Sequence, residues 1–144
     1  MNLTAFGLAQ RFIGFKEVQG SVSNPAILAM LKLDEAWPAG DETPWCSAFV
    51  NYIAWLMRLP RSKKLNARSW LTVGASIPLQ DARAAFDIVV LNRPPSPESG
   101  HVGLFAGYES PNTILLLGGN QGDSVCVAPF AASRVIGVRR LWEA

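Results

Sequence analysis

The chain has 144 residues, of which 49% are hydrophobic and 17% are charged, and its formal net charge is +2. This length and composition predict one globular domain over residues 1–144 and exclude an intrinsically disordered chain. Apolar stretches of only a few residues exclude stable insertion into a membrane, and one short basic cluster at residues 61–64 argues against a nucleic-acid partner. One histidine and two cysteines are too few for a usual four-ligand zinc site, so we expect neither a metal nor another cofactor.

The N-terminal half of the chain has the spacing of amphipathic helices. Asn24 followed by Pro25 predicts a helix cap and first turn, and Thr43-Pro44 predicts a second start of the same kind. The segment Trp37–Glu42 between them is expected to be a loop. Helices are therefore expected over residues 3–13, 25–33, 43–59 and 67–71.

The C-terminal half has shorter apolar runs that are separated by turn residues. Short connections such as Ser110-Pro111-Asn112 favour antiparallel neighbours. The fold class is therefore α+β, with N-terminal helices packed on an antiparallel sheet of about five strands. The expected strands are Phe86–Leu91, His101–Tyr108, Thr113–Leu117, Ser124–Val127 and Val135–Leu141.

The first residues, Met1 to Phe6, lack a basic start that is followed by a long apolar stretch, and Arg11 interrupts the one candidate. We therefore expect no signal peptide, and we expect synthesis and folding in the cytoplasm.

Cys46 is the most informative residue, because it lies at about the third position of the helix that Thr43-Pro44 begins. Unpaired backbone N–H groups and the helix dipole favour a thiolate at such a position, and the thiolate is the effective nucleophile. The alternative is a small buried core residue, which is the commonest fate of a free cysteine. The helix start alone favours this alternative.

His101 favours the interpretation of Cys46 as a nucleophile over that of a buried core residue. It is the one histidine of the chain, and it begins a predicted strand between Gly100 and Gly103, which leave room for a close approach. A cysteine at a helix start and a histidine on a distant strand are what nucleophilic catalysis needs. Asn120 is a third candidate, because its amide oxygen can accept the imidazole N–H, and Gln121 is a plausible substitute. Both residues also fit an ordinary glycine-rich turn.

Several segments, taken in order, resemble the CHAP and NlpC-type cell-wall cysteine peptidases of the papain-like superfamily. More narrowly, they resemble small phage and prophage lysis proteins. The resemblance covers nearly the whole chain. It is carried by Asp41–Asn51, Gly100-His101-Val102-Gly103, Leu117–Gln121, Val135–Arg140, Ala67–Trp70 and Asn24-Pro25.

The resemblance implies a papain-like fold in which Cys46 is the nucleophile, His101 is the general base and acid, and Asn120 orients the imidazole. The backbone N–H of Cys46 is the expected oxyanion donor. One departure is Phe86-Asp87, where the family commonly has Gly-Asp before the first strand.

Five side chains are candidates for substrate binding. Asp41 and Glu42 would face a free amine of the substrate, although they fit equally well as acidic residues that favour the helix dipole. Trp45 and Trp70 would line the cleft, although tryptophans are more often core residues. Gln121 completes the set.

The function that follows is a peptidoglycan hydrolase that cleaves an amide bond of the stem peptide by a Cys-His-Asn mechanism. Its partner is bacterial peptidoglycan, and it would act in the periplasm or cell wall after delivery by a holin or a secretion system. A phage or prophage endolysin is favoured over an antibacterial secretion-system effector, through resemblance alone. A catalytically inactive wall-binding module, or a structural domain with a Cys46–Cys126 disulfide, are the alternatives.

Overall fold

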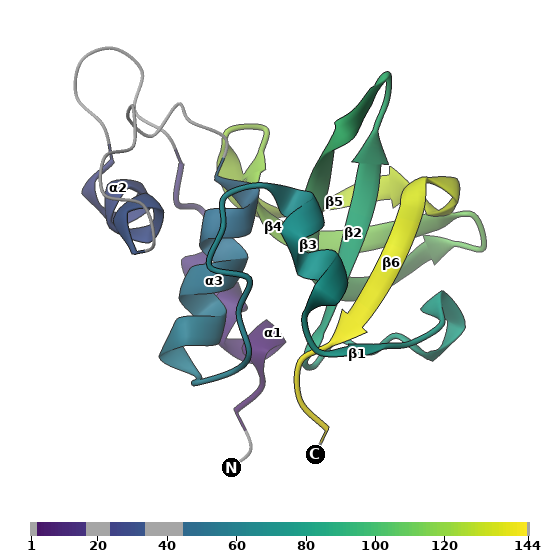
Figure 1. Cartoon of the computed structure of the whole chain (residues 1–144), viewed down its shortest axis with the longest axis horizontal. Coiled ribbons are helices and arrows are strands. Elements are labelled where there is room, and N and C mark those ends of the chain that lie inside the picture. The colour runs from purple at the N-terminus through teal and green to yellow at the C-terminus, as the bar shows by residue number, and fades with distance from the viewer. Residues whose placement is uncertain (1–2, 17–23, 34–44, 144) are drawn as a thin grey trace.

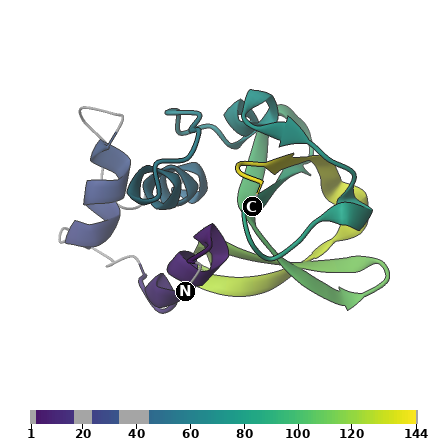
Figure 2. The same cartoon turned by 90° about the horizontal axis from the view of Figure 1, so that it is seen from below.

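Helices of the N-terminal third pack against a six-stranded antiparallel sheet in the computed structural model, which describes residues 3–16, 24–33 and 45–143 (Figure 1). The short helix α1, α3 and the 3₁₀ helix η2 contact the sheet, whereas α2 packs on the outer side of α3 (Figure 2). The predicted α+β class and antiparallel pairing are confirmed. The helical elements are α1 (Ala5–Ala9), η1 (Gln10–Phe12), α2 (Pro25–Lys32), α3 (Cys46–Leu56), η2 (Ala67–Thr72), η3 (Leu79–Asp81) and η4 (Ala132–Arg134).

The sheet has the strand order β1-β6-β2-β3-β4-β5, and every neighbouring pair is antiparallel. All five predicted strands are present, and most run further than predicted. The additional strand β1 has two residues, which is too short for an apolar pattern to reveal. The bounds are β1 (Ala75–Ser76), β2 (Asp87–Arg93), β3 (Ser96–Ser110), β4 (Thr113–Gln121), β5 (Ser124–Ala131) and β6 (Val135–Arg140).

Both faces of the central strands are buried, because two apolar clusters lie on opposite sides of the sheet. Ile88 and Val90 of β2 belong to the cluster under the helices, whereas Val89 and Leu91 belong to the cluster on the far face. Alternate residues of a strand point to opposite faces, so the continuous apolar run of β2 serves both clusters. We refer to them as the helix-side core and the far-side core.

The predicted helix starts are confirmed where the structure describes them. The Asn24 side chain accepts a hydrogen bond from the N–H of Ala26 (2.9 Å), and Pro25 is the first residue of α2. Helix α3 begins at Cys46, and the start predicted at Thr43-Pro44 lies outside the described residues. No described helix has the length and hydropathy that a membrane span requires.

Asp87 joins the start of β2 to the end of β6. Its two carboxylate oxygens accept from Nε (2.8 Å) and Nη2 (2.9 Å) of Arg140, and the side chain of Asp87 is only 1% exposed. The preceding Phe86, which stands where the cell-wall peptidases that the sequence resembles commonly have glycine, packs edge-on against Trp142 near the C-terminal end. This departure therefore adds a packing contact away from Cys46.

Candidate active site

The Cys46 side chain lies at the N-terminal end of α3 and is 5% exposed. It reaches a pocket of about 300 Å³ between the segment before η2 and the start of β3. Three N–H groups of a first helical turn have no partner within the helix, so the backbone there can stabilise negative charge. The lining residues are Cys46, Leu65, Asn66, Ala67, Arg93, Glu98, Ser99 and Gly100.

Gly119 of β4 holds this end of the helix against the sheet. A Cβ atom on Gly119 would lie 2.6 Å from two ring carbons of Trp45 and 2.8 Å from Cβ of Phe49. Only glycine therefore allows β4 and the start of α3 to approach this closely. The glycine-rich segment of β4 thus positions the residue that immediately precedes the cysteine.

A buried polar network fixes the next turn of α3. Ser47 Oγ donates to the carbonyl of Lys64 (2.6 Å) and accepts from Nε1 of Trp70 (2.9 Å). Asn51 Nδ2 donates to the same Lys64 carbonyl (3.1 Å), and Asn51 Oδ1 accepts from the N–H of Lys63 (2.9 Å). The network ties the segment that lines the pocket to the helix that carries Cys46.

The two tryptophans considered for substrate binding are both fully buried. Trp45 packs under Gly119, and Trp70 donates into the network at Ser47. In this conformation neither ring is available to a ligand. Asp41 and Glu42 lie outside the described residues.

His101 of β3 is 6% exposed and is held by Gln121 at the end of β4. The ring Nε2 lies 2.9 Å from Gln121 Oε1. The amide nitrogen of Gln121 donates to the carbonyls of Leu116 (3.1 Å) and Cys126 (2.8 Å), which fixes the orientation of the carboxamide. Because Oε1 can only accept, Nε2 carries the proton and Nδ1 is the basic nitrogen of the neutral ring.

It is Gln121, and not Asn120, that contacts the imidazole. Asn120 has a φ of 59°, and this left-handed residue brings the chain round so that the next side chain faces His101. A Cβ atom on Gly118 would lie 2.5 Å from Gln121 Oε1, so this glycine makes the space for the carboxamide. The sequence analysis named both Asn120 and Gln121 as candidates, and it is Gln121, the substitute candidate, that contacts His101.

One face of the His101 imidazole packs on an aromatic ring. The ring centroids of His101 and Phe130 are 5.2 Å apart, and the Arg134 guanidinium lies over the same Phe130 ring at 5.6 Å. Arg134 also donates to the carbonyl of Asn92 (2.9 Å). Phe130 and Arg134 were not identified from the sequence, because both lie between the predicted strands Ser124–Val127 and Val135–Leu141.

Burial keeps both reacting groups neutral. Desolvation raises the pKa of the Cys46 thiol, although the N–H groups of Val102 and Ser47 and the charge of Arg93 oppose it. Desolvation also lowers the pKa of His101, whereas the hydrogen bond that His101 donates to Gln121 raises it. The resting pair is therefore thiol and imidazole, not thiolate and imidazolium.

Cys46, at the start of α3, lies beside the part of β3 that carries His101, but the two side chains are not hydrogen-bonded to each other. The thiol interacts with the backbone N–H of Val102, the residue after His101. In the register of the sheet His101 lies opposite Leu91, a residue of the far-side core, whereas Val102 and Cys46 belong to the helix-side core. The structure thus brings the cysteine beside the histidine's strand and leaves Nδ1 without a hydrogen-bond partner among the described residues.

Arg93, at the end of β2, is a further candidate that the sequence analysis missed. It lines the pocket with Cys46, and its charge lowers the pKa of both Cys46 and His101. One guanidinium therefore lies within electrostatic reach of both groups. Its place directly before Pro94-Pro95 makes it look like an ordinary turn residue in the sequence.

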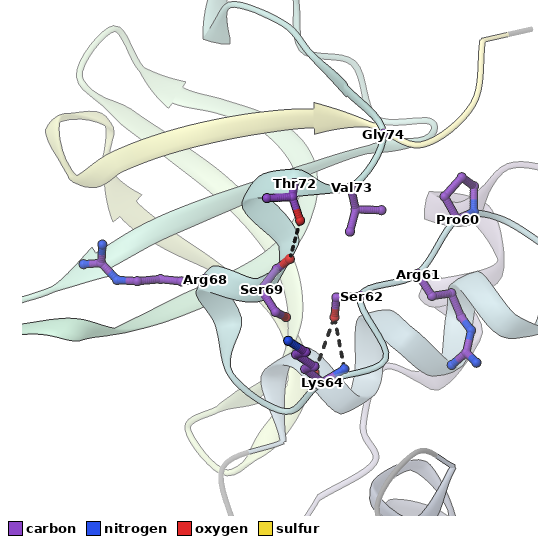
Figure 3. Close-up of a pocket in the computed structure, with 9 residues that line it drawn as sticks. All are labelled: Pro60, Arg61, Ser62, Lys64, Arg68, Ser69, Thr72, Val73 and Gly74. Carbon is purple, nitrogen blue, oxygen red and sulfur yellow. Dashed lines mark hydrogen bonds between the residues drawn. The ribbon is translucent and has the colours of Figure 1, made fainter.

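A larger pocket of about 550 Å³ lies on the other side of η2 (Figure 3). In this view Arg61 and Arg68 point away from each other, and Arg68 Nε donates to the carbonyl of Ser99 (2.7 Å). The candidate chemistry belongs to the smaller pocket, because that one reaches the Cys46 thiol. Among the described residues no cluster of three or more His, Cys, Asp or Glu side chains is placed to hold a metal ion.

Solved structures that are similar to this chain include NlpC1 and NlpC2 from Trichomonas vaginalis. Each aligns with a TM-score of 0.57 and 18% sequence identity over 97% of this chain. The chain spans less than half of those proteins, 44% of NlpC1 and 46% of NlpC2. No protein-family profile and no curated protein matches it. The fold is therefore NlpC-like, as predicted, whereas a closer relation to CHAP or phage proteins stays a prediction.

Proposed function

We propose that the chain is a peptidoglycan hydrolase that cleaves an amide bond of the stem peptide, with Cys46 as the nucleophile and His101 as the general base and acid. The observation that carries this proposal is the Cys46 pocket, which opens beside the strand on which Gln121 orients His101. The NlpC-like fold supports the same chemistry. Gln121 takes the orienting role that the resemblance gave to Asn120.

The reaction starts from the neutral pair. The Cys46 proton passes through water to Nδ1 of His101 as the sulfur attacks the amide carbon. The oxyanion accepts hydrogen bonds from N–H groups at the start of α3. The imidazolium then protonates the leaving amine, the C–N bond breaks, and water that is deprotonated by His101 hydrolyses the thioester.

Gln121 acts on the imidazole and not on the substrate. By accepting the Nε2 proton, it keeps Nδ1 as the basic nitrogen and stabilises the imidazolium that forms during attack. Arg93 favours the thiolate and disfavours the imidazolium, so its net effect on proton transfer is small.

Mass spectrometry of fragments released from purified peptidoglycan tests the activity and identifies the bond. Wild-type protein should release fragments with a new amine and a new carboxylate, and folded Cys46→Ala should release none. His101→Ala should lower the rate by about 10²–10⁴-fold. Absence of fragments from wild-type protein, or cleavage by Cys46→Ala, would contradict the proposal, and the former result would favour an inactive wall-binding module.

We further propose delivery as a phage or prophage endolysin, in preference to a secretion-system effector. This choice is supported by the resemblance to small lysis proteins described above. Cytoplasmic expression should lyse a bacterial host only when a holin is co-expressed. Lack of lysis with a holin, together with killing by a periplasm-targeted version, would favour the effector.

The alternative of a structural domain with a Cys46–Cys126 disulfide does not agree with the structure. Both cysteines are free, and the Cys126 thiol donates to the carbonyl of Gln121 (3.4 Å). Cys126 therefore lies beside the residue that holds His101, on β5.

A further inference from the structure

We propose that the Cys46 pocket binds the substrate residue next to the scissile amide, and that Arg93 selects for a free carboxylate on that residue. This inference rests on the proposed function. The pocket of about 300 Å³ is lined by the Cys46 side chain itself, so a group that fills it lies beside the attacking sulfur.

The Arg93 guanidinium is available to a ligand. Arg93 is exposed, and its guanidinium has no hydrogen bond or ion pair with any described residue, whereas its backbone pairs with Ser96 in the sheet. The arginines of the last strand differ from it, because Arg139 binds the carbonyls of Val73 and Gly74, and Arg140 binds Asp87. A guanidinium presents a planar set of donors that matches a carboxylate in two parallel hydrogen bonds.

The charge of Arg93 is also felt at the reacting groups. It lowers the pKa of Cys46 and of His101, so the guanidinium lies near enough to both for a bound carboxylate to change them. A carboxylate at Arg93 would offset that positive charge at both groups, so the His101 imidazolium would be easier to form and the Cys46 thiolate harder. Because these two effects oppose each other, recognition of the carboxylate should act on binding and not on proton transfer.

Glu98 gives the pocket an opposing charge. It lines the same pocket and is exposed. A carboxylate that binds at Arg93 is repelled by Glu98, so the two side chains should affect binding in opposite directions. Opposite effects of removing the Arg93 charge and the Glu98 charge would be expected of charges that face a bound carboxylate, and a control arginine outside the pocket reports the effect of net charge alone.

The test uses two synthetic stem peptides that differ only in one group, a free carboxylate or a carboxamide on the residue beside the cleaved bond. Wild-type protein should prefer the carboxylate. Arg93→Gln should raise KM for the carboxylate peptide about tenfold, the lower range for a hydrogen bond to a charged group, and leave the carboxamide peptide unchanged. Glu98→Gln should lower KM for the carboxylate peptide. Arg93→Lys should keep part of the preference.

Arg11→Gln is the matched control, because it removes one guanidinium from an exposed position on η1. It should leave both KM values unchanged. An unchanged carboxylate preference in Arg93→Gln, or equal effects of Arg93→Gln and Arg11→Gln, would overturn the inference while leaving the proposed function standing.

Binding to Cys46→Ala, measured by calorimetry with the same two peptides, separates the inference from the proposed function. If wild-type protein cleaves neither peptide, the proposed function fails for these substrates, and the calorimetric preference alone decides the role of Arg93. Tighter binding of the carboxylate peptide that is lost in Cys46→Ala/Arg93→Gln supports it. Equal binding of the two peptides contradicts it.

Discussion

Gln121 Oε1 lies 2.9 Å from His101 Nε2, and this contact decides which ring nitrogen is left for chemistry. The carboxamide cannot turn over without losing its bonds to the carbonyls of Leu116 and Cys126. Nδ1 is therefore the basic nitrogen in the neutral ring. The orientation of the base is set by strands β4 and β5, not by the helix that carries the nucleophile.

Gln121→Ala should lower the rate by about 10–100-fold, a part of what general acid–base catalysis contributes, because the ring is no longer held. The hydrogen bond that His101 donates to Gln121 raises the pKa of His101, so its removal should move the acid limb of the pH–rate profile to lower pH. The measurement is kcat/KM between pH 4 and pH 8. A loss of rate with an unmoved acid limb would indicate a general structural defect.

Asn120 should matter for its backbone conformation. Asn120→Gly should keep activity and stability, because glycine adopts a positive φ without strain, whereas Asn120→Ala should cost about 1 kcal/mol of unfolding free energy. Urea unfolding and peptidoglycan turnover check both variants. If Asn120→Gly loses as much activity as Gln121→Ala, the Asn120 side chain is the orienting group after all.

Cys126 should be dispensable for chemistry although it lies close to Gln121. Its backbone carbonyl accepts from Gln121 Nε2, and a serine hydroxyl can still donate to the carbonyl that the thiol contacts. Cys126→Ser should therefore keep near-normal turnover and full sensitivity to thiol alkylation. A folded Cys126→Ser protein without activity would assign the nucleophile to the wrong sulfur.

The free energy of unfolding should decrease as the pH is lowered, because protonation of His101 is less favourable in the folded state than in the unfolded state. Burial lowers the pKa of the folded-state imidazole below 6.5, so the unfolded state binds more protons between that lower pKa and 6.5. The stabilising contribution is therefore present above pH 6.5 and is lost as the pH falls below it. Urea unfolding at pH 7.5, 6.5 and 5.5 should show a steeper loss for wild-type protein than for His101→Gln. Parallel losses would contradict this assignment.

Asp87 and Glu143 both pair with Arg140 and form a matched comparison. Asp87→Asn should destabilise by about 3 kcal/mol, because it removes the charge of a buried carboxylate from a two-bond pair. Glu143→Gln should change stability by less than about 1 kcal/mol, because this side chain is 65% exposed. Denaturant unfolding checks both. Equal effects would mean that burial does not decide the strength of these pairs.

Local patterns were enough to predict the longer helices and strands, but not the short elements β1, η3 and η4. The Asn24-Pro25 start and the strands followed from capping chemistry and apolar runs, which depend on neighbours in sequence. The hydrogen bond from Trp70 to Ser47 did not follow, because the two residues lie on different elements. Arg93 could not be identified for a similar reason, since only the sheet brings the end of β2 to the start of α3.

The choice between Asn120 and Gln121 shows where sequence reasoning stops. Both amides can accept an imidazole N–H, and an Asn in a glycine-rich turn is compatible with a positive φ but does not require it. That single dihedral angle determines which side chain turns towards His101. Candidate residues were therefore predictable, whereas their order of importance depended on backbone conformation.

Gly119 and Gln121 are two residues apart, and one seats the start of α3 while the other holds the imidazole. The length of the β4 segment between them therefore fixes the position of Cys46 relative to His101. Inserting or deleting one residue there would displace either the start of α3 or the Gln121 carboxamide, and the two groups would no longer be aligned. Length variants, natural or engineered, should therefore be tolerated at the exposed Pro111-Asn112 turn and eliminated between Gly118 and Gln121.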